Sequence, residues 1–97
     1  MYEDDHDDIL TAARAGDLDE AAAVLSMDNR LTRVTDADGR TPLHLAALGG
    51  HTATVELLLH NNADPSARDR AGRTPLSLAE GAGHAATAER LRRAGGR

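Results

Sequence analysis

The fold is decided by a stretch that occurs twice, first as Gly39-Arg40-Thr41-Pro42-Leu43 and 33 residues later as Gly72-Arg73-Thr74-Pro75-Leu76. Over residues 36–60, 14 of 25 positions are identical to the positions 33 residues further on. A weaker copy precedes them at an offset of 34, where Ala12-Ala13 matches Ala46-Ala47. Self-similarity at this period indicates an array of stacked structural repeats.

Each repeat has the pattern of two helices and a turn. Thr41 is a good N-cap and Pro42 a good first helical residue, and Gly49-Gly50 is expected to end this short first helix. The apolar spacing predicts a second helix over about residues 52–60. Asn62 follows it, where helix ends often need a left-handed backbone. Residues 36–39 and 69–72 both start with Asp and end with Gly, as type I turns prefer.

The ordered motif Thr41-Pro42-Leu43-His44-Leu45-Ala46-Ala47, followed by Gly50-His51, Val55-Glu56-Leu57-Leu58-Leu59 and Asn62-Ala63-Asp64, resembles the ankyrin repeat. The resemblance implies an all-α solenoid of three stacked helix-turn-helix units joined by β-turn finger loops. We expect one domain over residues 1–97, with an N-terminal capping repeat at 5–35, a full repeat at 36–68 and a C-terminal capping repeat at 69–97.

The last repeat departs from the middle one in a way that suits the end of a stack. Arg90, Arg92 and Arg93 replace the residues that match Leu57, Leu59 and His60, and Ser77 replaces His44. A polar outer face keeps a terminal repeat soluble. The leading Met and this polar closing repeat favour a complete small protein.

Two threonines are expected to weaken the core. Thr54 and Thr87 stand where the resemblance implies aliphatic residues. Three repeats are also close to the minimum for a stable stack. We therefore expect a modest free energy of unfolding, about 5 kcal/mol.

Composition excludes several classes of protein. The 97 residues carry a net charge of −5 and contain no Cys, so neither a disulfide framework nor thiolate chemistry is available. The acidic start lacks the pattern of a secretory signal, and no apolar run is long enough to span a membrane. A cytoplasmic protein that binds neither membranes nor nucleic acids is expected, since Tyr2 is the only aromatic residue that could stack on a base.

No constellation of residues predicts catalysis, a metal or a cofactor. His51 and His84 are repeat-equivalent, so they lie roughly 10 Å apart and cannot share one ion. The resemblance implies structural roles for His44 and His51. The acidic run Glu3, Asp4, Asp5, Asp7 and Asp8 lacks the spacing and the Gly of a calcium loop, and a solvated tail with a helix cap is favoured. We predict a protein that is not an enzyme.

The resemblance to ankyrin repeats also implies which face binds a partner. Family members contact their partners through the turn tips, or fingers, and through the exposed ends of the first helices, or palm. In this sequence those positions include Arg14, Ala37, Asp38, Arg40, Leu48, Arg68, Arg70 and Arg73. Five arginines on one face of an acidic protein, with Leu48 as an apolar anchor, predict binding to an acidic patch on another protein. The alternative is that repeat turns simply favour charged residues.

These observations predict a protein-protein interaction module, acting as an adaptor, an inhibitor or a stabiliser through its concave face. Such a module is expected to be a monomer when purified alone. The alternative function is a structural or self-assembling scaffold without a separate partner, in which the capping faces associate with each other. Light scattering distinguishes the two.

Overall fold

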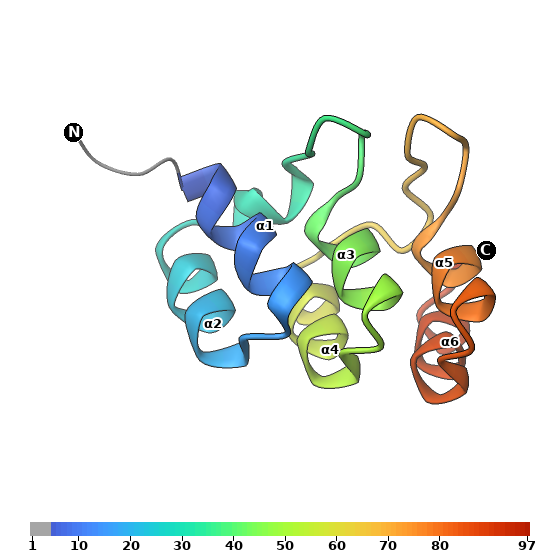
Figure 1. Cartoon of the computed structure of the whole chain (residues 1–97). Helices are drawn as coiled ribbons and strands as arrows, with labels where there is room; N and C mark the ends of the chain where they lie inside the picture. Colours follow the sequence, from blue (N-terminus) through green and yellow to red (C-terminus); the bar gives the residue numbers. More distant parts are fainter. Residues whose placement is uncertain (1–4) are drawn as a thin grey trace.

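The computed structural model describes residues 5–97, and the regular secondary structure in that range is entirely helical. The helices form three consecutive pairs (Figure 1). Their bounds are α1 Asp5–Ala15, α2 Leu18–Met27, α3 Pro42–Leu48, α4 Thr52–His60, α5 Pro75–Gly81 and α6 Ala85–Arg93. The predicted all-α architecture of stacked helix-turn-helix units is confirmed.

Tyr2, Glu3 and Asp4 lie outside the described residues, as do the side chains of Asp5, His6 and Asp7. The expected solvated tail therefore stays a prediction. Within the described part of the chain, no helix is both long enough and apolar enough to cross a membrane.

Helices α3 and α5 begin at the predicted residues because their caps are encoded locally. The Thr41 side chain accepts a hydrogen bond from the His44 backbone N–H, and the His44 ring accepts one in return from the Thr41 N–H. Thr74 and Ser77 make the same reciprocal arrangement at the start of α5. Each cap satisfies two N–H groups that the helix leaves unpaired. Asn62 has a φ of 69°, so the predicted left-handed end of α4 is confirmed.

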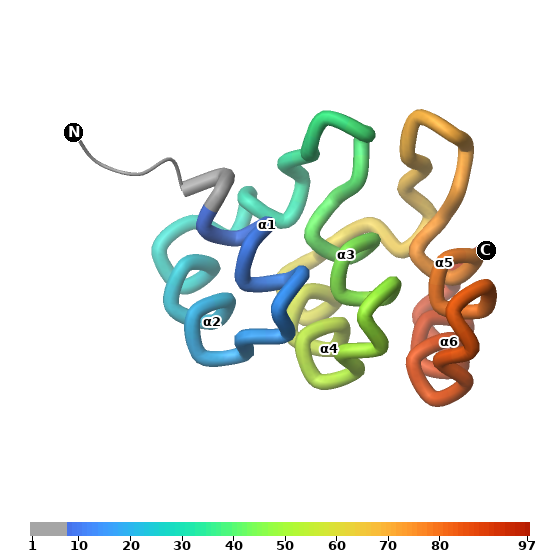
Figure 2. The backbone as a smooth tube through the Cα atoms, in the orientation of Figure 1, coloured from blue at the N-terminus to red at the C-terminus, as the bar shows by residue number. Residues whose placement is uncertain are grey.

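The helices form two layers, with α1, α3 and α5 in one row and α2, α4 and α6 in the other (Figures 1 and 2). Two long loops, at residues 34–41 and 67–74, protrude on the same side of the stack. We call them finger loops. Between α2 and the first finger loop runs a 3-10 helix, η1, over Asn29–Arg33, which the sequence analysis did not predict.

The core runs along the stack between the two layers. Ile9, Leu43, Val55, Leu58 and Leu91 are completely inaccessible to solvent. The two threonines expected to weaken this core are also buried. The hydroxyl of Thr87 lies 2.7 Å from that of Thr52, so burial leaves it with a partner in the preceding repeat.

Histidine rings lock neighbouring repeats together. The Nε2–H of His51 donates to the Arg14 carbonyl, and that of His84 donates to the Leu48 carbonyl, both at 3.1 Å. Each ring packs over a glycine of the preceding repeat, and a Cβ on Gly50 would lie 2.6 Å from Nδ1 of His84. Glycine is therefore required at that position twice over, since Gly50 also has a φ of 71°.

Candidate protein-binding face

Each finger loop is built around one aspartate. In the first loop, Asp36 accepts hydrogen bonds from the N–H groups of Asp38 and Arg40. The Gly39 N–H also donates to the Asp36 carbonyl at 3.0 Å, which closes the predicted turn. Asp69 organises the second loop in the same way, through the N–H groups of Ala71 and Arg73. The turns are thus held by side chain as well as backbone.

Asp69 also joins two arginines from different repeats. Its carboxylate lies 3.6 Å from Nε of Arg40 and 3.8 Å from Nε of Arg73, and its side chain is only 2% exposed. Burial alone raises the pKa of Asp69, but the N–H donors of Arg73 and Ala71 and the positive charge of Arg73 outweigh it. The pKa of Asp69 therefore lies below its ordinary value. The buried carboxylate is held charged.

Arg40 belongs to this internal link more than to a free surface. Its side chain is 22% exposed, against 53% for Arg73 and 68% for Arg14. The Nε atom of Arg40 is fully buried and points to Asp69 without reaching hydrogen-bond distance. Arg14 forms a more exposed pair with Asp36 at 3.6 Å. Three of the five arginines predicted to bind a partner thus face carboxylates of this chain.

Arg68 and Arg70 are different. Both are exposed, and neither makes an ion pair with any side chain of residues 8–97. The Arg70 backbone N–H donates to the Asp38 carbonyl at 3.0 Å, so the two finger loops are fixed to each other while the side chain stays available. The free guanidinium groups therefore lie on the second finger loop, on either side of buried Asp69.

The remaining predicted residues lie on the same two features. Ala37 and Asp38 are exposed at the tip of the first finger loop. Leu48 ends α3 and is 38% exposed, one of few large apolar side chains so exposed among the described residues. It lies seven positions beyond Thr41, the last residue of the finger loop, which is a rise of about 10 Å along the helix. A partner that contacts both features has to span that length.

The sequence indicates the two aspartates only as turn formers, but the structure gives them a second role. Asp36 and Asp69 are repeat-equivalent and each lies close to an arginine of the preceding helix pair or loop. The one sign of this second role in the sequence is that each aspartate is followed four residues later by an arginine, Arg40 or Arg73. Which arginine contacts which aspartate depends on how the repeats stack, and this cannot be read from the spacing of the residues in the sequence.

His44 connects the candidate face to the core. Its ring is wholly buried, and the Nε2–H donates to the Arg73 carbonyl of the next finger loop at 2.8 Å. Burial lowers the pKa of His44, and the bond to the Arg73 carbonyl only partly opposes this. The neutral ring therefore positions the second finger loop over the start of α3.

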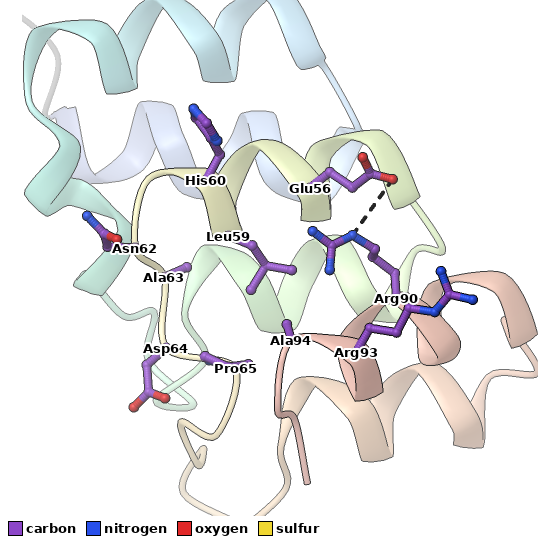
Figure 3. A pocket seen from close by; sticks show the side chains of 10 residues that line it. All are labelled: Glu56, Leu59, His60, Asn62, Ala63, Asp64, Pro65, Arg90, Arg93 and Ala94. Atoms are coloured by element: carbon purple, nitrogen blue, oxygen red, sulfur yellow. Dashed lines mark ion pairs between the residues drawn. The ribbon is translucent and has the colours of Figure 1, made fainter.

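A large cavity lies elsewhere and was not predicted. It is an open groove of about 730 Å³ between α4 and α6, on the layer of second helices (Figure 3). Leu59, Ala63 and Ala94 contribute apolar surface, and Arg90 extends across it toward Glu56, 4.0 Å away. The groove is wide and its charges are mixed. It has no convergent set of acid, base and nucleophile.

Among the described residues, no group of three or more His, Asp or Glu side chains is placed to hold a metal ion. Histidine is a common metal ligand, and the sequence contains five. Three of them, His44, His51 and His84, instead bond to backbone carbonyls of a neighbouring repeat.

The geometry defines a class of protein: a short helix-pair solenoid that presents two rigid, stacked finger loops beside a row of short helices. Residues 9–96 match the family model for ankyrin repeats in three copies. The chain belongs to the ankyrin-repeat family, whose members generally mediate protein-protein interaction and are generally not enzymes.

The chain is similar to short segments of much larger proteins. It is 44% identical over 61 residues to a probable E3 ubiquitin-protein ligase of Oryza sativa subsp. japonica, covering 62% of this chain and 12% of that protein. It is 50% identical over 50 residues to a 60 kDa lysophospholipase of Mus musculus, covering 52% and 9%. The GA-binding protein subunit beta-1 of Bos taurus is 43% identical over 60 residues, covering 62% and 15%. The chain thus spans about a tenth of these relatives.

Proposed function

We propose that the protein is a non-enzymatic interaction module that binds an acidic segment of another protein through its finger loops and the adjoining ends of the first helices. The observation that carries this proposal is the pair of exposed, unpaired guanidinium groups of Arg68 and Arg70 on a rigid loop. Arginine recognises carboxylates with two parallel hydrogen bonds, and a fixed loop reduces the entropy lost on binding. Adaptor, inhibitor and stabiliser roles all fit this mode of binding.

The eight predicted contact residues take unequal parts in the proposed site. Arg68 and Arg70 supply charge, and Leu48 supplies an apolar anchor. Arg40 and Arg73 position the second finger loop through Asp69. Arg14, Ala37 and Asp38 form the edge of the face on the side of the first repeat. We propose that the domain comprises the whole chain, with repeats at 5–35, 36–68 and 69–97, and that it acts in the cytoplasm as a monomer.

A variant that tests this proposal must leave the fold intact. Reversing Arg40 would place a carboxylate beside buried Asp69 and destabilise the loop, so loss of binding by that variant would be ambiguous. The Arg68→Glu/Arg70→Glu double variant avoids this, because neither side chain has a partner among the described residues. Its matched control is Arg33→Glu/Arg97→Glu, which changes the net charge equally at two other exposed arginines.

Immobilised wild type, double variant and control are used to capture proteins from a lysate of the source cell, followed by mass spectrometry. The proposal expects at least one acidic protein that wild type and control retain and the double variant loses. If the double variant captured the same proteins in equal amounts, the charges of Arg68 and Arg70 would not be part of the binding site. Light scattering on the same samples tests the alternative scaffold role, because the interaction module is expected to be monomeric without its partner.

A further inference from the structure

Three arginines lie around one buried carboxylate of the second finger loop. Arg40 and Arg73 direct their Nε atoms at Asp69, at distances of 3.6 and 3.8 Å. The side chain of Arg70 starts beside Gly39, which directly precedes Arg40: a Cβ on Gly39 would lie 3.2 Å from the Cγ of Arg70. We call Arg40, Arg70 and Arg73 the arginine cluster.

The arginine cluster carries more positive charge than the chain neutralises. Within residues 8–97, Asp69 is the one carboxylate that forms an ion pair with it, so the cluster and its carboxylate have a net charge of +2. Asp38 lies on the adjoining loop tip but makes no ion pair with any described residue. Charges more than about 8 Å apart are largely screened at physiological ionic strength. A ligand therefore meets this local surplus and not the net charge of the whole chain.

The outer nitrogens of the cluster are free to bind a ligand. The Nε of Arg40 is buried, but its two terminal nitrogens reach solvent and make no hydrogen bond with residues 8–97. The side chain of Arg73 is about half exposed, and its terminal nitrogens also have no hydrogen-bond partner in that range. Arg70 is exposed and makes no ion pair there. Three guanidinium groups thus present N–H donors without an acceptor.

We propose that the arginine cluster binds the phosphate group of a phosphorylated side chain on the partner protein. This inference rests on the proposed function, because it names the chemistry that the same face recognises. A phosphate group carries a charge of about −1.5 to −2 at neutral pH and has three strong acceptor oxygens. It therefore matches the surplus charge and accepts from more than one guanidinium group. A carboxylate carries one charge and would leave part of the surplus without a counterion.

The exposure of the cluster indicates that the phosphate group belongs to a larger molecule. Sites for free small molecules bury about 70–90% of the ligand surface, whereas Arg70 and Arg73 lie on an open loop. The net charge of −5 disfavours docking on an anionic membrane. The bond from the Arg70 N–H to the Asp38 carbonyl holds the two finger loops to each other, which suits them to a partner protein.

The probes are phosphoserine and glutamate, both blocked as N-acetyl methylamides so that they differ only in the side chain. They are titrated into the ¹⁵N-labelled full chain at constant ionic strength and a pH of about 7.5, where phosphoserine is mostly a dianion. Phosphoserine should give saturable shifts of the Nε–H signals of the cluster, with a Kd on the order of 1–10 mM. Glutamate should bind about fivefold more weakly.

Each other result of this titration overturns the inference. Equal affinity for glutamate would leave the proposed binding of acidic segments standing but remove the preference for phosphate. The absence of saturable shifts with phosphoserine would overturn the phosphate site even if the lysate experiment identified a partner. Co-sedimentation with vesicles of phosphatidylcholine and phosphatidic acid, without binding of phosphoserine, would assign the face to a membrane instead.

Two matched variants test where the probe binds. Arg70→Gln removes one charge of the cluster and should weaken phosphoserine binding about fivefold. Arg33→Gln removes the same charge from an exposed arginine of η1 that has no ion pair with residues 8–97, and it should change the affinity less than about twofold. Equal weakening by the two variants would show that the net charge of the chain attracts the probe, and this overturns the site.

The charge of the probe supplies a last control. The second pKa of phosphoserine is about 6, so most of the dianion is lost between a pH of about 7.5 and about 5.5, whereas sulfate keeps both charges. Phosphoserine binding should therefore weaken about twofold to fourfold relative to sulfate over this range. A constant ratio of the two affinities would mean that the second charge contributes nothing, and the assignment of a phosphate group would be wrong.

Discussion

The two junctions of the stack differ in the balance between apolar burial and directed polar contacts. At the first, α1, α2 and η1 bring a large apolar surface to the middle repeat, including Ile9, Leu10, Val24, Leu25 and Leu31. Among the described residues, its polar links are the His51–Arg14 bond and one exposed ion pair. The first junction therefore depends mainly on burial, which is roughly proportional to apolar area and tolerant of geometry.

The second junction adds many directed contacts to the burial of Leu76, Ala79 and Leu91. The links that join the middle repeat to the last one include His44 to the Arg73 carbonyl, Arg40 to Asp69, the Arg70 N–H to the Asp38 carbonyl, Thr52 to Thr87, His84 to the Leu48 carbonyl and Arg90 to Glu56. Directed contacts fix the position of an element more tightly than burial does. The junction that carries the second finger loop is thus the one with the stricter geometry.

The largest expected effect comes from breaking the apolar junction. Ile9 is wholly buried, and Ile9→Ala should lower the free energy of unfolding by about 2–5 kcal/mol. A stack with a free energy of unfolding of about 5 kcal/mol would then retain only about 0–3 kcal/mol. Urea denaturation followed by circular dichroism measures this. A loss below about 1 kcal/mol would show that the first junction does not depend on burial.

Breaking the directed junction should have a smaller and more local effect. His44→Ser keeps the helix cap, as Ser77 does in the last repeat, but removes the bond to the Arg73 carbonyl. We expect a loss of about 1–3 kcal/mol, with faster amide hydrogen exchange confined to the second finger loop, α5 and α6. Exchange that accelerates equally in α1 and α2 would contradict two separate junctions.

Sequence alone predicted the parts of this molecule that are set locally. Thr41, Pro42 and Asn62 act within a few residues of themselves, so the sequence around each of them is enough to place its cap or turn. The 3-10 helix at Asn29–Arg33 was not predicted, since the first repeat matches the second at an offset of 34 and not 33, and this stretch lies where the alignment of the repeats changes.

The candidate face was harder to predict, since its charges are shared between repeats. The sequence could place Arg40 and Arg70 on one surface, but not show that Arg40 faces a buried carboxylate and that Arg70 does not. The difference arises from stacking at a distance of 29 residues along the chain, between Arg40 and Asp69. Which predicted residues remain free to bind is therefore a tertiary property.

His44, at the second junction, makes the free energy of unfolding depend on pH. Because burial lowers the pKa of His44, the folded state favours the neutral ring. Its contribution to stability is complete above the unfolded pKa of about 6.5 and is lost as the pH falls below that value towards the folded pKa. Wild type should therefore lose more stability than His44→Ser between a pH of about 7.5 and about 5.5. The control is His60→Gln, at an exposed histidine, which should behave as wild type does.

The smallest effect separates two arginine–aspartate pairs, one at each junction. Arg40 and Arg14 both face the aspartate of the next finger loop at 3.6 Å, but their side chains are 22% and 68% exposed. Water screens an exposed pair, so Arg14→Ala should cost less than about 0.5 kcal/mol, whereas Arg40→Ala should cost about 1 kcal/mol. The measurement is thermal denaturation of both variants at low and high salt. Equal costs would mean that burial does not distinguish the junctions at this position.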